Sequence, residues 1–332
     1  MSPHSLPLKL IAGNAHPCLG DSLARELNVP LLHADLNGFD GSETTVHVAG
    51  DVRDASVFIV QPTCPPVNDH LMVLALLADA VRAAGAAHVT AVVPYFGYAR
   101  QGRRGDGRDA RAARVVGRLL GAVGINHLIA LDVHSSGLES ALPMPTNILR
   151  AEDVFLPRVK AWGVHDLVVV SPDSDGMERA ERYATALEAP LAVIAKRLLK
   201  TRTAPFWQVL GDVRGCECLI VDDMVNTGDT LIDAAEALRC AGASDVHAIF
   251  THAAMSPIAT VRLFNARFGK ILTTDSVPAQ CRPWIEVVPI APLLANAIRD
   301  LTGEEGSYQD DGVHVPLAKS RTQELKPACV ET

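Results

Sequence analysis

Two adjacent aspartates and a turn rich in threonine form the clearest chemical pattern in this sequence. Asp222 and Asp223 follow the apolar run 218–221, and the turn Thr227-Gly228-Asp229-Thr230 comes soon after. Carboxylates bind the hydroxyl groups of a sugar, while amides and hydroxyls at the start of a helix bind a phosphate. We therefore predict a sugar-phosphate site, with a capped turn and two solvated aspartates as the alternative. Its residues are Asp222, Asp223, Asn226, Thr227, Gly228 and Thr230.

Further apolar runs are followed by residues that suit phosphates or a base. Arg100 and Gln101 come after the run 89–93. Arg100 offers a guanidinium fork for a triphosphate, and Gln101 offers an amide for a purine edge. His134 and Asp173 each follow a later run of the same kind. Taken singly, an arginine in a surface ion pair and a structural histidine remain alternatives to these roles.

Short apolar runs that alternate with helical stretches must position these residues. Such runs are typical of parallel strands whose two faces are covered by helices. Glycines stand where a helix would stop and turn back into the sheet, at Gly85, Gly124, Gly163 and Gly242. The pattern predicts an α/β fold with right-handed crossovers, in which ligands bind beyond the carboxyl ends of the strands.

The chain also contains an internal repeat. The tetrapeptide Gly-Asp-Val-Arg occurs at 50–53 and at 211–214, and the stretch 79–93 is similar to 236–250. Because the pieces come in the same order in both halves, we infer a duplication rather than the ordinary likeness of α/β units. The expected organisation is a domain at 1–150, a second domain at 151–305 and a flexible tail at 306–332.

Composition excludes several classes of protein. The 332 residues are 48% hydrophobic and 20% charged, and the formal net charge of −8 argues against a general nucleic-acid binder. Neither a secretory leader nor a membrane segment is expected, because no run of about 18 apolar residues occurs. Seven scattered cysteines without a CxxC pair favour a reducing cytoplasm. Mg²⁺ is the expected ion, since it prefers oxygen ligands and bridges phosphates.

From about Leu10 to Thr302 the chain resembles the ribose-phosphate pyrophosphokinase family. The most specific segment is Val93-Pro94-Tyr95-Phe96-Gly97-Tyr98-Ala99-Arg100-Gln101, and the stretch 66–72 is also typical of the family. The segment 222–230 alone is shared with type I phosphoribosyltransferases. The resemblance implies two phosphoribosyltransferase-like domains, each a mostly parallel sheet flanked by helices. It also implies that ATP binds on the side of the first domain, ribose 5-phosphate binds on the side of the second, and diphosphate passes from ATP to the sugar.

The same resemblance implies roles for individual residues. ATP contacts are implied for Phe39, Glu43, Arg100, Gln101 and His134, with the segment 39–43 reaching a neighbouring subunit. His134 and Asp173 would hold Mg²⁺, and Asp173 would also face the ribose. Lys196, with Arg197 or Arg202, would stabilise charge on the leaving AMP. A homo-oligomer is implied as well, made of dimers grouped into a hexamer.

The loop expected from Ala195 departs from the family pattern. Lys196 matches, but Leu198 stands where an arginine is expected, so Arg197 or Arg202 would have to substitute, and a solvated basic loop is the alternative. Further departures are Gly41, Gly102, Asp175, Asn226 and Asp229. The Asp229 carboxylate should weaken phosphate binding unless it points away or holds a cation. A catalytically weak regulatory homologue and a phosphoribosyltransferase therefore stay open as alternatives.

Overall fold

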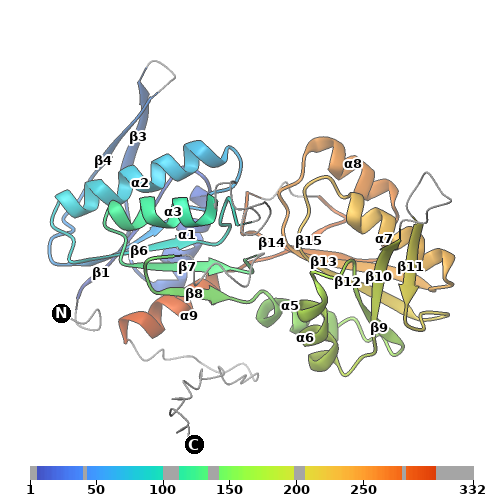
Figure 1. Ribbon diagram of the computed structural model, residues 1–332. Coiled ribbons are helices and arrows are strands. Elements are labelled where there is room, and N and C mark those ends of the chain that lie inside the picture. The colour runs from blue at the N-terminus through green and yellow to red at the C-terminus, as the bar shows by residue number, and fades with distance from the viewer. Residues whose placement is uncertain are drawn as a thin grey trace, which may run out of the picture.

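The computed structural model describes residues 6–39, 43–99, 112–133, 142–197, 206–278 and 282–303. For Phe39, Lys196, Arg197 and Phe206 it describes the backbone alone. Each half of the chain forms one large sheet covered by helices, and the two halves lie next to each other along the long axis of the molecule (Figure 1). Among the described helices, none combines the length and the apolar character that crossing a membrane requires.

The first sheet contains six parallel strands in the order β2-β1-β5-β6-β7-β8. They are β1 (Leu8–Ala12), β2 (Leu31–Leu32), β5 (Ser56–Val60), β6 (His88–Val93), β7 (His127–Leu131) and β8 (Thr146–Leu149). The described helices of this half are α1 (Pro17–Leu27), α2 (Val67–Ala83) and α3 (Ala112–Ala122). A two-stranded antiparallel hairpin, β3 (Ala34–Phe39) and β4 (Glu43–Val48), projects from this half (Figure 1).

The second sheet contains seven strands in the order β11-β10-β9-β12-β13-β14-β15. They are β9 (Leu167–Ser171), β10 (Leu191–Arg197), β11 (Phe206–Leu210), β12 (Glu217–Met224), β13 (Asp245–His252), β14 (Ile271–Thr274) and β15 (Glu286–Val288). Helix α5 (Glu152–Lys160) follows the last strand of the first sheet, and the described helices of the second half are α6 (Met177–Leu187), α7 (Asp229–Cys240), α8 (Pro257–Asn265) and α9 (Ala291–Thr302). Only β11 runs antiparallel to its neighbour within the described sheet. The predicted class, α/β with a mostly parallel sheet flanked by helices in each half, is confirmed.

The strand orders show that the two halves repeat one topology. The order β2-β1-β5-β6-β7-β8 of the first sheet has the same sequence of crossovers as β10-β9-β12-β13-β14-β15 of the second. The repeated tetrapeptides also fold alike: Gly50 and Gly211 have φ of 119° and 127°. In each, the aspartate that follows accepts a hydrogen bond from the backbone N–H two residues later, at 3.0 Å in the first half and 3.3 Å in the second. Left-handed backbone at these two positions explains why glycine is repeated there.

The segment from Ala195 differs from the expectation of a loop. Strand β10 continues to Arg197, because Lys196 and Arg197 pair with Trp207 and Phe206 of the antiparallel strand β11. The expectation that a loop begins at Ala195 is therefore wrong, and Leu198 and Arg202 lie outside the described residues.

The last helix of each half packs against the other half. Helix α5, which follows the last strand of the first sheet, contacts α6, whereas α9, which follows the last strand of the second sheet, contacts α1 (Figure 1). Leu294 and Ile298 of α9 and Leu19 and Leu23 of α1 belong to one buried cluster that also includes strands of both sheets. This reciprocal exchange joins the halves through a continuous apolar core.

Candidate functional site

The carboxyl ends of the two sheets meet in the middle of the molecule. Thr251, near the end of β13, donates a hydrogen bond to the carboxylate of Asp132, which follows β7. The neighbouring His252 Nε2 lies 3.1 Å from the Leu131 carbonyl oxygen, and its Nδ1 lies 2.7 Å from Ser276 Oγ. Burial lowers the pKa of His252, so the ring is neutral. Because a carbonyl only accepts, Nε2 carries the proton and Nδ1 accepts from Ser276.

A cavity of about 510 Å³ lies at this junction. Its lining comes from the β5–α2 connection, the segment after β6 and the end of β12: Pro66, Val67, Asn68, Asp69, Tyr95, Phe96, Tyr98, Ala99 and Met224. The cavity therefore joins the family-like segment before Arg100 to the segment that carries Asp222 and Asp223. Arg100, Gln101 and His134, three of the predicted ATP contacts, lie outside the described residues.

The predicted sugar-binding aspartates contact a third residue, Arg179. Its guanidinium lies 3.5 Å from Asp222 Oδ1 and 3.6 Å from Asp223 Oδ2, and all three side chains are largely buried. Burial, then the adjacent Asp223 carboxylate, raises the pKa of Asp222 to about 8, and Arg179 opposes this shift. The raised pKa therefore favours a proton on Asp222 near neutral pH.

Arg179 was not among the predicted site residues, although the sequence contains a signal for it. It is the third residue of α6, and a helix dipole favours acidic rather than basic residues in that first turn. A basic residue there, soon after a strand end, indicates a carboxylate or an anion close by.

The turn after β12 has the form that a phosphate site requires. Gly228 adopts φ 80° immediately before α7, where a Cβ would be strained. Asn226, Thr227 and Thr230 are exposed around it, and the first amides of α7 have no partner within the helix. Six of the seven residues predicted for the sugar phosphate therefore lie on one strand end and the helix start that follows it, and the seventh, Asp173, follows β9.

Asp173 lies after β9 in a tight turn. Its Oδ1 accepts hydrogen bonds from the amides of Asp175 at 3.0 Å and Gly176 at 2.9 Å, which fixes the carboxylate. Asp175 itself does not adopt a positive φ, so the departure from glycine at this position introduces no backbone strain. Across the part of the chain that the structure describes, no three His, Cys, Asp or Glu side chains converge as a metal site. The oxygen donor of Asp173 suits Mg²⁺ rather than a thiolate-seeking metal.

The equivalent position in the first half is filled by protein. Gln61 stands where the second half has Asp222, and it is fully buried. Its Oε1 accepts from the Ala15 amide at 3.1 Å, and its Nε2 donates to Asn14 Oδ1 and to the His70 carbonyl, both at 3.2 Å. A side chain at Gly13 would collide with Gln61. Among the described residues, the turn predicted to bind a sugar phosphate is therefore open in the second half, whereas Gln61 fills the matching position in the first.

The remaining predicted residues lie on projecting strands. Glu43 is exposed at the start of β4 and pairs through its backbone with Phe39, whose side chain lies outside the described part. Strand β10 ends with the backbones of Lys196 and Arg197, and the side chains of these two residues also lie outside the described part of the chain. The structure thus brings six sugar-phosphate residues together at the end of β12 and the start of α7, places Glu43 on the hairpin of the first half, and ends β10 beside β9, the strand that Asp173 follows.

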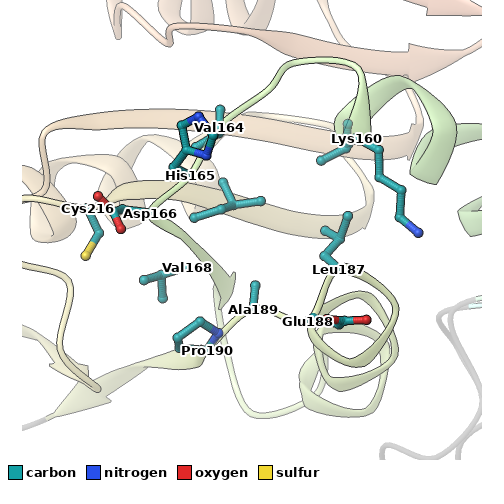
Figure 2. A pocket seen from close by; sticks show the side chains of 12 residues that line it. Lys160, Val164, His165, Asp166, Val168, Leu187, Glu188, Ala189, Pro190 and Cys216 are labelled. Atoms are coloured by element: carbon teal, nitrogen blue, oxygen red, sulfur yellow. The ribbon is translucent and has the colours of Figure 1, made fainter.

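A second cavity of about 340 Å³ lies at the opposite end of the second sheet (Figure 2). It is lined by residues of α5 and α6 and by residues just before β9, β10 and β12, including His165, Asp166, Pro190 and Cys216. These are the amino ends of the strands. Ligands of open α/β sheets bind at the carboxyl ends, so this cavity is not the candidate site.

Comparison with known proteins agrees with a chain made of two related domains. Residues 8–124 match the family model for the N-terminal domain of ribose phosphate pyrophosphokinase, and residues 158–267 match the phosphoribosyl transferase domain. The chain is 37% identical over 310 residues to the ribose-phosphate pyrophosphokinase of Bradyrhizobium diazoefficiens, covering 92% of this chain and 98% of that protein. It is 40% identical over 305 residues to the one from Chromobacterium violaceum, covering 90% and 93%.

A solved structure extends this likeness to three dimensions. The phosphoribosylpyrophosphate synthetase from Mycobacterium smegmatis superposes with a TM-score of 0.82 at 34% identity, covering 90% of this chain and 99% of that chain. The likeness therefore spans both halves and the junction between them.

Proposed function

This chain belongs to the ribose-phosphate pyrophosphokinase family, and from that premise we propose that it transfers the β,γ-diphosphate of Mg-ATP to ribose 5-phosphate. The anomeric hydroxyl attacks the β-phosphorus, a new O–P bond forms, and the bond to the oxygen of the α-phosphate breaks. The products are 5-phosphoribosyl 1-diphosphate and AMP, and the hydroxyl proton is released.

The observation that carries this proposal is the meeting of two strand-end sites at one cavity. Family-like residues that lead to Arg100 line one side, and Met224, which follows Asp223, lines the other. A reaction between a nucleotide and a sugar phosphate needs both substrates held within bonding distance and in line. Two sheets that face each other by their carboxyl ends support that arrangement.

In the proposed arrangement each group has one task. Asp222 and Asp223 bind the ribose hydroxyls, the turn at Thr227 binds the 5-phosphate, and Arg100 with Gln101 binds ATP. His134 and Asp173 would hold Mg²⁺, which neutralises phosphate charge when bound. Lys196, with Arg197 or Arg202, would meet the charge that develops on AMP.

We also propose that the protein acts as a homo-oligomer of dimers, grouped into a hexamer. The β3–β4 hairpin supports this, because it projects from its own half while carrying Phe39 and Glu43 (Figure 1). A projecting hairpin can reach the ATP of a neighbouring subunit. The proposed compartment is the reducing cytoplasm, which agrees with the free thiols of the described cysteines.

Phosphorus NMR of the products tests the proposed reaction. The purified protein, ATP, Mg²⁺ and ribose 5-phosphate should give AMP and a doubly substituted sugar with a diphosphate signal. Formation of ADP and a sugar with one added phosphate would contradict diphosphate transfer. A chain that binds both substrates without turnover would instead support the weak regulatory homologue.

A further inference from the structure

Asp229 is the acidic residue that the proposed function leaves unexplained. It is the first residue of α7, directly after Gly228, so its carboxylate starts from the helix end that is proposed to bind the sugar phosphate. The Asp229 side chain is 54% exposed to solvent. An anion at this helix end competes with a phosphate for the same amides and repels it.

The structure pairs this carboxylate with Arg262 of α8. Arg262 Nη2 lies 2.5 Å from Asp229 Oδ1, and the Arg262 side chain is 44% exposed. A hydrogen bond from the Thr227 hydroxyl and the contact with Arg262 together lower the pKa of Asp229, so the carboxylate stays ionised. The pair is therefore a charged tether between the phosphate turn and α8.

Helix α8 is placed to hold this tether. Ser256 caps it by accepting a hydrogen bond from the Ala259 amide at 3.2 Å, and Pro257 begins it. A side chain built on Gly228 would meet the Ala259 carbonyl and Leu263 at 3.9–4.0 Å, so α8 packs directly against the turn. Arg262 stands next to Leu263 on this packed side of the turn.

We propose that Arg262 is a positioning residue for the sugar phosphate. By pairing with Asp229 it holds the carboxylate against α8 and neutralises it, which leaves the amides at the start of α7 available to the phosphate of ribose 5-phosphate. The inference rests on the proposed function, because it assumes that this turn binds the substrate. It makes Asp229 and Arg262 one unit, in which the acid is harmful only when the arginine is missing.

A double-mutant cycle tests this unit by calorimetric binding of ribose 5-phosphate. Arg262→Ala should weaken binding about five- to tenfold, because an uncompensated carboxylate then faces the phosphate. Arg262→Lys should keep most of the affinity. Asp229→Ala combined with Arg262→Ala should restore affinity to within about twofold of the unmodified chain. Raising the ionic strength should shrink the loss in Arg262→Ala.

Arg158→Ala is the matched control. Arg158 pairs with Glu286 at 3.2 Å, and these side chains are 54% and 47% exposed, close to the values of the Arg262 pair. It should bind ribose 5-phosphate as the unmodified chain does. An Arg262→Ala variant with normal affinity would overturn the inference, as would a double variant as weak as Arg262→Ala, because Arg262 would then act directly on the phosphate. An unmodified chain that does not bind ribose 5-phosphate would overturn the proposed function as well.

Discussion

At the scale of single residues, Asp222 and Asp223 are held between burial, which disfavours their charge, and Arg179, which favours it. Two carboxylates this close share a proton more readily than they carry two charges. The Arg179 side chain is 14% exposed and lies 3.5 and 3.6 Å from the two carboxylates, so its charge offsets the negative charge that the site presents to ribose.

We expect Arg179→Gln to weaken ribose 5-phosphate about tenfold or more while ATP affinity changes little. Removing one partner of a buried charged cluster leaves the carboxylates without compensation and free to move. Calorimetric titration with each substrate measures the difference. Arg182→Gln is the matched control, because Arg182 lies one turn away on the same helix and pairs with Glu152 at 3.0 Å instead. Equal effects of the two substitutions would contradict the role of Arg179.

The raised pKa of Asp222 predicts a pH-dependent stability. In the folded chain Asp222 has a pKa of about 8, whereas in the unfolded chain its pKa has the usual value of 3.8. Since the folded state binds more protons between these values, stability falls as the pH rises through that window. Asp222→Asn should remove this dependence of the unfolding free energy on pH. It should also stabilise the chain by about 1–2 kcal/mol near pH 8, less than the full pKa shift implies because solvent screens part of the charge. Urea unfolding at about pH 5 and pH 8 measures it, and equal slopes in both proteins would refute it.

At the scale of elements, the strands and the glycine turns were predictable because local pattern determines them. Gly85, Gly124, Gly163 and Gly242 all adopt positive φ, from 67° to 98°, as helix-ending glycines should. The end of β10 was not predictable, because Lys196 extends the strand only through its pairing with Trp207 of β11. The role of Arg179 was not predictable for the same reason, because its partners lie on a strand more than 40 residues later in the sequence.

The end of β10 carries the third prediction. Lys196→Ala should reduce kcat and kcat/KM together by about 10² to 10³, because a residue that meets charge only in the transition state leaves ground-state binding unchanged. Steady-state kinetics and calorimetric ATP affinity measure the two effects separately.

Arg197→Ala and Arg202→Ala decide which arginine works with Lys196. A large loss for Arg202→Ala beside a mild one for Arg197→Ala would assign the role to Arg202, and the reverse pattern would assign it to Arg197. An unchanged kcat in Lys196→Ala would contradict the role proposed for Lys196 at the leaving AMP.

At the scale of the whole molecule, the two halves are joined by the exchange of their last helices. No helix pattern in the sequence foretells this, because amphipathic spacing shows that a helix buries one face but not which surface covers it. The prediction of domains at 1–150 and 151–305 stays untested as a boundary, yet α9 of the second range packs on α1 of the first.

The substitution Ile298→Ala tests whether α9 of the second half stabilises α1 of the first half. Ile298 is fully buried in α9, and its truncation should cost about 2–4 kcal/mol. Hydrogen exchange should lose protection in α1, which lies at the other end of the sequence, before it does so in α7. Ile258→Ala is the control, because Ile258 on α8 is 73% exposed and its truncation should change little. Protection lost first in α7 would contradict the packing of α9 on the first half.

The exchanged helices also set the order in which a newly synthesised chain can finish folding. A ribosome adds about 5–20 residues per second, and domains usually fold as they emerge. Here the strands of the first half end at Leu149, but the helix that covers α1 begins only at Ala291. The first half therefore waits roughly 7 to 30 seconds with an apolar face uncovered. The first half is completed only when α9 emerges, after every described strand of the second half, so release of a nascent chain that ends before Ala291 leaves α1 uncovered.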